Sequence, residues 1–391
     1  MKFVFSFILT FLICSDFHAQ QKIRVGLFQD LLPEALVVHC ISGEYNVATD
    51  TDERKMQKGD LLYISITGDS VLLTDGDMNY GFYRHINFKD IGQHGVLRIR
   101  PVNPSGEPGN YEGDLEITIN HETLYAVNIV DFDKYIAGVV EVEGGPAAPA
   151  GFYKALAVLC RTYAIRNFHA HSTEGFNLCD QTHCQVYKGR SEQNPEIQGA
   201  VLATHNLVLT GRYFVLVNAV YHSNSGGETQ RASDVWTNDH EYLQAILDPF
   251  SQDQPNYLWE KSIPFDLWKN YLISNGFNTV NKADSLDLLI TQNHRRKYFT
   301  LEKDTLRIEK VRSDLNLRSG FFNMELKGDS VVFKGRGYGH GVGLSQEGAM
   351  EMARQGFSFS DILRFYFHQV QIRDILNIPD EQLPEEFRET R

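Results

Sequence analysis

Residues 111–168 read YEGDLEITINHETLYAVNIVDFDKYIAGVVEVEGGPAAPAGFYKALAVLCRTYAIRNF, and the hydrophobic pattern changes within this stretch. Apolar and polar residues alternate over 115–119 and 124–130, which is typical of strands with one buried face. Over 152–168 the apolar residues recur with the period of a helix, and Pro149 stands just upstream, where helices commonly begin. The stretch therefore predicts strands followed by a helix.

The flanking segments extend this pattern and predict an α+β fold. Residues 21–105 alternate apolar and polar positions between Asp-Gly and Gly-Asp pairs, which indicates a β-rich N-terminal region. A connector rich in proline and glycine at 101–109 leads into a main domain over 106–380, and residues 381–391 form a polar tail. We expect mixed, largely antiparallel strands with several helices packed around a cleft.

The pattern downstream predicts further elements of both kinds. Residues 207–222 return to strand character, whereas residues 255–275 have the pattern of a helix. Two closing helices are expected at 345–355 and 360–367, the second with Ser360 as its N-cap.

Residues 1–20 differ from the rest of the chain. A lysine is followed by an apolar run that ends at Ile13, which predicts a secretory signal peptide cleaved near Ala19. Cys14 raises lipidation as an alternative, but the large residue before it is not what a lipoprotein signal has. No later stretch is apolar for long enough to span a bilayer. We expect an exported protein of the periplasm or cell envelope, without a stable membrane span after signal cleavage.

The formal net charge is −13 over 391 residues. An acidic chain is a poor generic binder of nucleic acid or of anionic lipid, so no nucleic-acid partner is expected. The charge instead suits a substrate that is recognised by hydrogen bonds.

Two glutamates, Glu141 and Glu143, stand directly before a Gly-Gly-Pro break. The run before them predicts a strand, on which residues two apart share a face. A carboxylate at such a strand end, backed by apolar residues, can have its pKa raised enough to act as a general acid. The alternative is a pair of solvated or ion-paired glutamates, which is the commoner situation for this residue type.

The segment 179–184 reads CDQTHC, and His169 and His171 stand upstream. Zinc binds thiolate and imidazole groups in tetrahedral sets, so two cysteines and two histidines could supply four ligands. The alternative is a disulfide between Cys179 and Cys184, which an oxidising compartment permits. The four cysteines beyond the signal peptide allow three full pairings, and the spacing does not choose among them.

The segment 335–346 reads GRGYGHGVGLSQ, with glycine at every second position up to residue 343. As a strand it would have one face bare of side chains, against which a sugar ring or another backbone can lie. Arg336, Tyr338 and His340 would occupy the other face and suit stacking on, and hydrogen bonding to, a saccharide. A helix that begins near Ser345 would offer free N–H groups to an anionic substituent. The alternative is a tight structural crossing.

The segment 221–229 reads YHSNSGGET. Ser223 or Ser225 with His222 suggests a nucleophile and its base, but neighbouring residues on a strand point apart. We therefore expect a polar wall that forms hydrogen bonds with the substrate. The alternative is an ordinary turn after a strand.

Taken in order, these segments resemble the stage II sporulation protein D family, which includes amidase-enhancer relatives. The resemblance runs from about residue 111 to about residue 375, and each motif alone is weak whereas the ordered set is specific. The matching motifs are YIxGVVxxE at 135–143, KAxAxxxRTYA at 154–164, CDxTHCQVY at 179–187, HSxSGGxT at 222–229 and GRGxGHGVGLSQxGA at 335–349.

The resemblance implies a peptidoglycan lytic transglycosylase. Such an enzyme cleaves glycan strands that lack stem peptides between N-acetylmuramic acid and N-acetylglucosamine, and it leaves 1,6-anhydro ends. The catalytic glutamate of the family maps to Glu143, and the proposed chemistry requires no cofactor. The alternative is a non-catalytic glycan-binding module that stimulates or recruits a cell-wall amidase, and a third reading is zinc-dependent hydrolysis.

The resemblance also implies the other site residues. A structural zinc would be held by Cys179, His183 and Cys184, with His171 as the fourth ligand and His169 as its rival. The residues expected to bind peptidoglycan glycan strands in the cleft are Arg161, His222, Ser223, Ser225, Arg336, Tyr338, His340, Ser345 and Gln346.

The sequence departs from the family pattern close to the acid. Gly144 and Gly145 follow Glu143, where the family usually has methionine, and Cys160 stands where alanine is usual. The glycine pair leaves Glu141 as an alternative position for the catalytic carboxylate.

Overall fold

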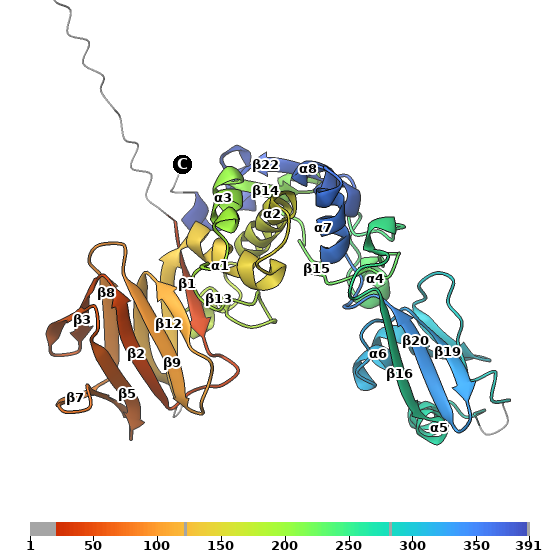
Figure 1. Cartoon of the computed structure of the whole chain (residues 1–391), viewed down its shortest axis with the longest axis horizontal. Helices are drawn as coiled ribbons and strands as arrows, with labels where there is room; N and C mark the ends of the chain where they lie inside the picture. The colour runs from red at the N-terminus through yellow and green to blue at the C-terminus, as the bar shows by residue number, and fades with distance from the viewer. Residues whose placement is uncertain (1–20, 121–122, 281–283, 389–391) are drawn as a thin grey trace, which may run out of the picture.

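The computed structural model describes residues 21–120, 123–280 and 284–388. Two β-sheets lie at one end of the molecule, helices form the middle, and a small arm of strands and helices lies at the other end (Figure 1). The expected α+β class with largely antiparallel strands is confirmed. The predicted signal peptide at 1–20, with Cys14, lies outside the described residues.

The two sheets at the N-terminal end pack their apolar faces into one core. Nearly all strand pairs are antiparallel, with β1 and β13 parallel. The first sheet contains, in spatial order, β13 (Leu178–Cys179), β1 (Lys22–Leu27), β12 (Thr123–Asp131), β11 (Asp114–Asn120), β8 (His85–Asp90), β3 (Glu44–Thr49) and β4 (Glu53–Gln57). The second contains β10 (Gly109–Glu112), β9 (Val96–Asn103), β2 (Ala35–Ser42), β5 (Leu61–Thr67), β6 (Ser70–Thr74) and β7 (Asn79–Tyr83).

These sheets continue past the boundary expected near residue 105. β9 and β10, on either side of the proline-rich connector, pair directly, with Arg98 opposite Asn110. β11 and β12 then pair with strands of the N-terminal region, and β12 ends at Asp131. The β-rich region therefore runs to residue 131, because the connector is a turn within a sheet.

The middle of the molecule is built around α2, whose sides contact the other helices of this part. It begins after Pro149, as expected, and its apolar residues are buried. The helices are α1 (Phe132–Gly144), α2 (Ala150–Arg166), α3 (Pro195–Ala203), α4 (Ala232–Val235), α7 (Gln346–Arg354) and α8 (Phe359–Tyr366). Two small strand pairs complete it: β14 (Leu207–Thr210) with β22 (Gln371–Asp374), and β15 (Tyr221–His222) with β21 (Leu344–Ser345).

The arm has a hydrophobic core of its own around the fully buried Trp268. Its main sheet has β20 (Ser330–Arg336) between β16 (Leu258–Pro264) and β19 (Phe322–Lys327). The helices α5 (Phe265–Ser274) and α6 (Ile308–Asp314) and the hairpin of β17 (Tyr298–Leu301) and β18 (Asp304–Arg307) complete it.

Three predictions of local structure were wrong. The run before Glu143 is the helix α1 rather than a strand, because Asp131 caps it and its apolar residues recur at helical spacing. Residues 255–275 begin as the strand β16 and become helical only at Phe265. The helix α8 is capped by Ser358 rather than Ser360, because Ser358 and Asp361 form a reciprocal capping box.

The polar tail expected over 381–391 carries one apolar anchor. Phe387 is buried, and its ring centroid lies 5.2 Å from that of Phe132 and 5.0 Å from that of Phe168. The described part of the tail is therefore docked on the first two helices.

Candidate functional site

Glu143 lies in the last turn of α1, where two distant segments meet it. Its Oε1 accepts a hydrogen bond from the backbone N–H of Val186 at 3.2 Å. Its backbone carbonyl accepts one from Nε2 of Gln346, the first residue of α7, at 2.9 Å. The side chain is half-buried, so it is held by the protein and still reaches the surface.

The glycine pair after Glu143 ends the helix. Gly145 has φ of +69°, a conformation that favours glycine, and its N–H donates to the carbonyl of Glu141 at 3.0 Å. Gly144 is buried, and an added Cβ there would come within 3.1 Å of the side chains of Phe152 and Leu156. The pair therefore stops α1 directly behind Glu143 and lets it pack closely on α2.

The surroundings of Glu143 favour its protonated form. Burial raises the pKa of this carboxyl, while the hydrogen bonds from the Val186 N–H and the Tyr221 side chain partly oppose that rise. The buried Cys160 thiol lies close enough that the Glu143 charge contributes, after burial, to raising the pKa of the thiol. A carboxylic acid with a raised pKa can donate a proton near neutral pH.

Glu141 has a different role, because two residues on a helix are about 200° apart rather than on one face. It is buried, and its carboxylate accepts hydrogen bonds from the Ser191 hydroxyl at 2.9 Å and the Gln193 N–H at 2.9 Å. The Glu192 N–H adds a third donor. Glu141 anchors the loop before α3, so it is a poor substitute for Glu143.

The segments 221–229 and 335–346 do lie together. β15 and β21 pair in parallel, with His222 opposite Ser345, and the backbones of Asn224 and Tyr338 exchange hydrogen bonds. The glycine-rich segment is a strand only up to Arg336, because the glycines at 337, 339, 341 and 343 all have positive φ. Beyond that point it forms the alternative, a tight crossing. At Gly343 an added Cβ would lie 2.2 Å from the Val220 carbonyl oxygen, so the close crossing requires glycine.

An aromatic group lines this crossing. The ring of His340 lies 5.0 Å from that of Trp236 and 5.5 Å from that of His222, measured between centroids. Burial lowers the pKa of His340 to about 4 and that of His222 well below its ordinary value, so both rings are neutral at pH 7. His340 and Trp236 are half-buried and Tyr338 is 45% exposed.

The predicted substrate-binding residues divide into accessible and enclosed ones. Ser223, Arg336, Tyr338, His340 and Gln346 retain exposed surface. Ser225 is fully buried, and its hydroxyl bonds to Asp248 at 2.7 Å and to Ser251 at 2.7 Å.

Ser345 and His222 are also enclosed. Ser345 caps α7 by accepting from the Gly348 N–H at 3.3 Å. His222 Nδ1 lies 3.1 Å from the Val342 carbonyl oxygen. These contacts hold the crossing together, so the enclosed residues serve the shape of the site.

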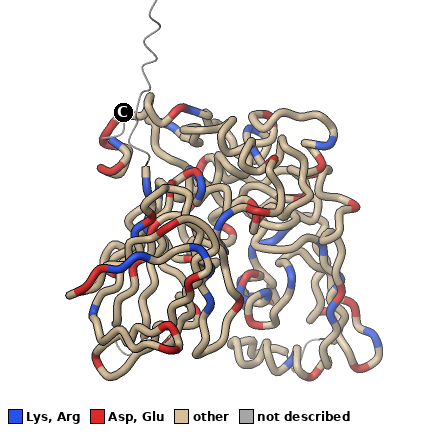
Figure 2. The backbone as a smooth tube through the Cα atoms, turned by 60° about the vertical axis from the view of Figure 1, so that its left-hand side comes forward, with Lys and Arg blue, Asp and Glu red and all other residues tan. Residues whose placement is uncertain are grey.

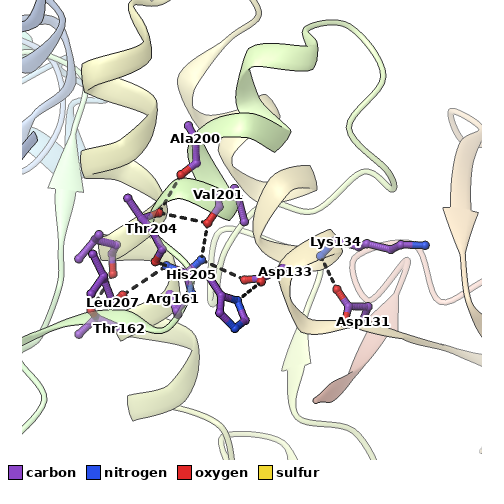
Figure 3. Close-up of polar contacts among 11 residues, drawn as sticks. Asp131, Asp133, Lys134, Arg161, Thr162, Ala200, Val201, Thr204, His205 and Leu207 are labelled. Carbon is purple, nitrogen blue, oxygen red and sulfur yellow. Dashed lines mark hydrogen bonds and ion pairs between the residues drawn. The ribbon is translucent and has the colours of Figure 1, made fainter. Parts of the chain in front are cut away.

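Arg161 lies within a polar network between helices (Figure 3). It is 2% exposed and its guanidinium donates to Asp133 at 3.0 Å and to the carbonyls of Thr204 at 2.8 Å and Val201 at 3.3 Å. These contacts join α2 to α1 and to the end of α3. The prediction that Arg161 binds substrate conflicts with this burial, since its donors face protein groups.

The four predicted metal ligands lie together. One ligand atom from each of His171, Cys179, His183 and Cys184 falls within 4.8 Å of all the others. Cys184 Sγ lies 3.4 Å from His171 Nε2 and 3.5 Å from His183 Nδ1, and Cys179 Sγ lies 3.9 Å from the latter. The rival His169 points elsewhere, with its Nε2 3.5 Å from Glu386.

The donor set fits zinc. Tetrahedral bonds of the usual Zn–S and Zn–N lengths separate sulfur and nitrogen ligands by about 3.6 Å, which these distances approach. The two cysteines are free thiols here, and the hydrogen bond from Cys184 lowers the pKa of Cys179, which favours the thiolate that zinc requires. His171 Nδ1 lies 2.7 Å from Glu174, the carboxylate contact that commonly orients a ligating histidine.

Charges of both signs are spread over the molecule (Figure 2). Lysines and arginines alternate with acidic residues in the sheets, the middle and the arm.

Sequence reasoning missed two residues near Glu143. Tyr221 contacts its carboxyl, and Gln185 contacts Tyr221. Neither side chain is charged, and Gln185 is 2% exposed. Each adjoins a recognised motif, since Tyr221 precedes His222 and Gln185 follows Cys184. That adjacency was the available signal.

Comparison with known proteins assigns this part of the chain to a family. The model of the family described as stage II sporulation protein matches residues 120–211. That range contains Glu143 and the four clustered cysteines and histidines.

Three relatives extend the match. Stage II sporulation protein D of Bacillus amyloliquefaciens is 28% identical over 285 residues, which cover 68% of this chain and 81% of that protein. The protein of the same name from Bacillus subtilis (strain 168) is 28% identical over 277 residues, or 66% and 79%. An amidase enhancer of Bacillus subtilis is 28% identical over 266 residues, which are 55% of this chain but 37% of that protein.

Proposed function

We propose that this chain, which is similar to stage II sporulation protein D, is a cell-wall enzyme, a peptidoglycan lytic transglycosylase with Glu143 as its acid. The observation that supports this most strongly is the half-buried Glu143 carboxyl, whose pKa is raised at the open end of α1. The substrate would be a glycan strand without stem peptides.

In the proposed reaction, protonated Glu143 donates its proton to the glycosidic oxygen between N-acetylmuramic acid and N-acetylglucosamine. The bond from C1 of the muramic residue to this oxygen breaks, and positive charge develops on that sugar. The resulting Glu143 carboxylate then takes the proton of the C6 hydroxyl of the muramic residue. The oxygen of that hydroxyl bonds to C1. One carboxyl group therefore serves both steps, and the Val186 N–H stabilises it while it is ionised.

The accessible residues at the crossing of 221–229 and 335–346 would bind the strand. Tyr338, His340 and Trp236 offer ring faces and polar edges, and neutral imidazoles form hydrogen bonds without the cost of burying charge. Gln346 joins this wall to the acid through its bond to the Glu143 carbonyl. The glycan would therefore lie between α1 and the start of α7.

A zinc ion held by His171, Cys179, His183 and Cys184 would be structural. Four protein ligands leave no open position, so the ion would supply no reaction chemistry. Its effect would be to fix the segment that leads from Cys184 to Val186, whose N–H meets the acid.

We propose that this activity lies in the cell envelope, which the predicted signal peptide supports. Among the described residues, no helix is long and apolar enough to span a membrane. The match to an amidase enhancer favours a second candidate function, in which the chain binds glycan and stimulates a cell-wall amidase without cutting.

Product analysis on peptide-free glycan strands separates these functions. We expect new 1,6-anhydro ends, counted by mass spectrometry, and a loss of roughly 10²- to 10⁴-fold in Glu143→Gln, as for removal of a general acid. Glu107→Gln, at an exposed position in the β9–β10 connector, is the matched control. Unchanged cleavage in Glu143→Gln would refute the assignment, and binding without new ends would favour the amidase-stimulating function.

A further inference from the structure

A cavity of about 220 Å³ lies between α1, β9 and β10. Three basic side chains line it: Arg98 of β9, and Lys188 and Arg190 of the loop before α3. Val142, the residue before Glu143, also lines it. The cavity therefore adjoins the helical turn that carries the acid.

The carboxylates at this cavity are already engaged. Glu192 lies 3.2 Å from Arg190 Nε and accepts from Asn110 Nδ2 at 3.1 Å. The carboxylate of Glu141 accepts hydrogen bonds from the loop, namely from the Ser191 hydroxyl and two backbone N–H groups. The donors to Glu141 are neutral and do not cancel its formal charge, so three basic and two acidic side chains line the cavity.

The other two cations have no such partner. Within the described ranges, neither Arg98 nor Lys188 forms an ion pair. Lys188 acts at longer range on Asp180, but that buried carboxylate is bonded to the Phe28 N–H at 2.8 Å. The cavity lining thus carries a formal excess of one positive charge in a protein whose net charge is −13.

The walls of the cavity are fixed by close backbone packing. An added Cβ on Gly138 of α1 would lie 2.2 Å from the Gly189 carbonyl oxygen, and one on Gly189 would lie 2.2 Å from that of Asn110. The Arg190 N–H donates to the same Asn110 oxygen at 2.8 Å. The helix, the loop and β10 therefore fix the backbone that carries Lys188 and Arg190, while the side chains of Arg98 and Lys188 are exposed.

We propose that this cavity binds the carboxylate of an N-acetylmuramic acid residue in the glycan strand, an inference that rests on the function proposed above. The cavity is smaller than the roughly 300–1,000 Å³ of ordinary ligand pockets, so it suits one acidic substituent rather than a peptide. N-acetylglucosamine lacks that carboxylate. A site for it on this face of α1 would therefore distinguish the two alternating sugars of the strand.

Calorimetric titration of the full-length exported protein with N-acetylmuramic acid, N-acetylglucosamine and glycerol phosphate tests the site directly. We expect the acidic sugar to bind and the neutral sugar not to bind, and salt to weaken the binding. Arg98→Gln and Lys188→Gln should each weaken it about tenfold, because each removes a charge-assisted contact. Arg100→Gln, exposed on the same strand but not lining the cavity, should bind as the unaltered protein does.

Each other outcome overturns the proposal. Equal binding of the two sugars, or full affinity in both cavity variants, would exclude a carboxylate site here. Tighter binding of glycerol phosphate would assign the cavity to a phosphate-bearing polymer instead. Failure of the proposed cleavage is a separate result, because monosaccharide binding does not require Glu143 to act, and melting curves verify that each variant is folded.

Discussion

The two ends of α1 hold a carboxylate in opposite surroundings. Near the N-terminus, Asp133 lies 3.0 Å from the buried guanidinium of Arg161 and 2.5 Å from the imidazole of His205. At the C-terminus, Glu143 meets the Val186 N–H and forms no ion pair within the described part of the chain. The first carboxylate pairs with the Arg161 guanidinium, whereas burial raises the pKa of the second.

This difference separates a carboxylate that stabilises the fold from one that can transfer a proton. An acid that must give up and regain a proton cannot be fixed in its charged form by a neighbouring cation. A buried arginine needs that fixed charge, because an unpaired guanidinium is costly inside a protein. The same short helix therefore provides both, one at each end.

The largest expected effect comes from breaking the ion pair of Asp133, near the N-terminus of α1. Arg161→Met leaves Asp133 without its buried partner and should lower the free energy of unfolding by about 3–5 kcal/mol. Urea unfolding curves measure it, with Arg364→Met, at an exposed position on α8, as the control. Equal midpoints for the two variants would show that the network in Figure 3 contributes little to stability.

Metal removal should have the next largest effect, because the proposed zinc site supports the segment that reaches Glu143. We expect a loss of about 3 kcal/mol, as for a ligand present at a few hundred times its Kd. Melting temperature and bound metal are measured with and without chelator. His171→Gln should lose the metal and His169→Gln should keep it, and the reverse result would exchange the two ligands.

A smaller effect on stability should appear when Glu143 is replaced by the uncharged glutamine. Because burial raises its pKa in the folded state, its protonated form stabilises the fold at low pH. That stabilisation is lost as the pH rises through the folded-state pKa. The melting temperature of Glu143→Gln should therefore equal that of the unaltered protein at acidic pH and exceed it at alkaline pH. Glu107→Gln should show no such divergence. Parallel curves at every pH would contradict the raised pKa.

The smallest effect is expected from a substitution at Cys160, the buried thiol close to Glu143. Burial raises the pKa of the Cys160 thiol, so it stays neutral, and Cys160→Ala should cost about 1 kcal/mol for the small cavity it leaves. Cleavage should stay within about twofold, since a general acid depends on its own charge and geometry. A tenfold loss of cleavage with unchanged melting would instead show that the thiol positions Glu143.

The sequence predicted which side chains lie together better than it predicted the secondary structure of the segments that carry site residues. The family resemblance implied the ligand set of Cys179, His183, Cys184 and His171, and these side chains do cluster. The spacing alone left a disulfide and His169 as alternatives. The run before Glu143 was predicted as a strand because its valines favour strands, but Asp131 and the packing on α2 make it a helix.

Arg161 shows what a motif cannot reveal. An arginine in a recognised segment suggested a substrate contact, yet its partners Asp133 and Thr204 lie 28 and 43 residues away. The cavity between β9 and α1 was not predictable for the same reason, since Arg98 and Lys188 meet only in the folded chain.

The arm begins and ends on neighbouring strands. β16 leads into it and β20 leads out, and Leu258 lies directly opposite Arg336 in the register of this antiparallel pair. A segment whose two ends adjoin, and which has its own core around Trp268, has the form of an insertion between two neighbouring points of the chain. Arg295 also ties this insertion to the middle of the molecule, because its guanidinium donates to the carbonyls of Ser225 and Glu228.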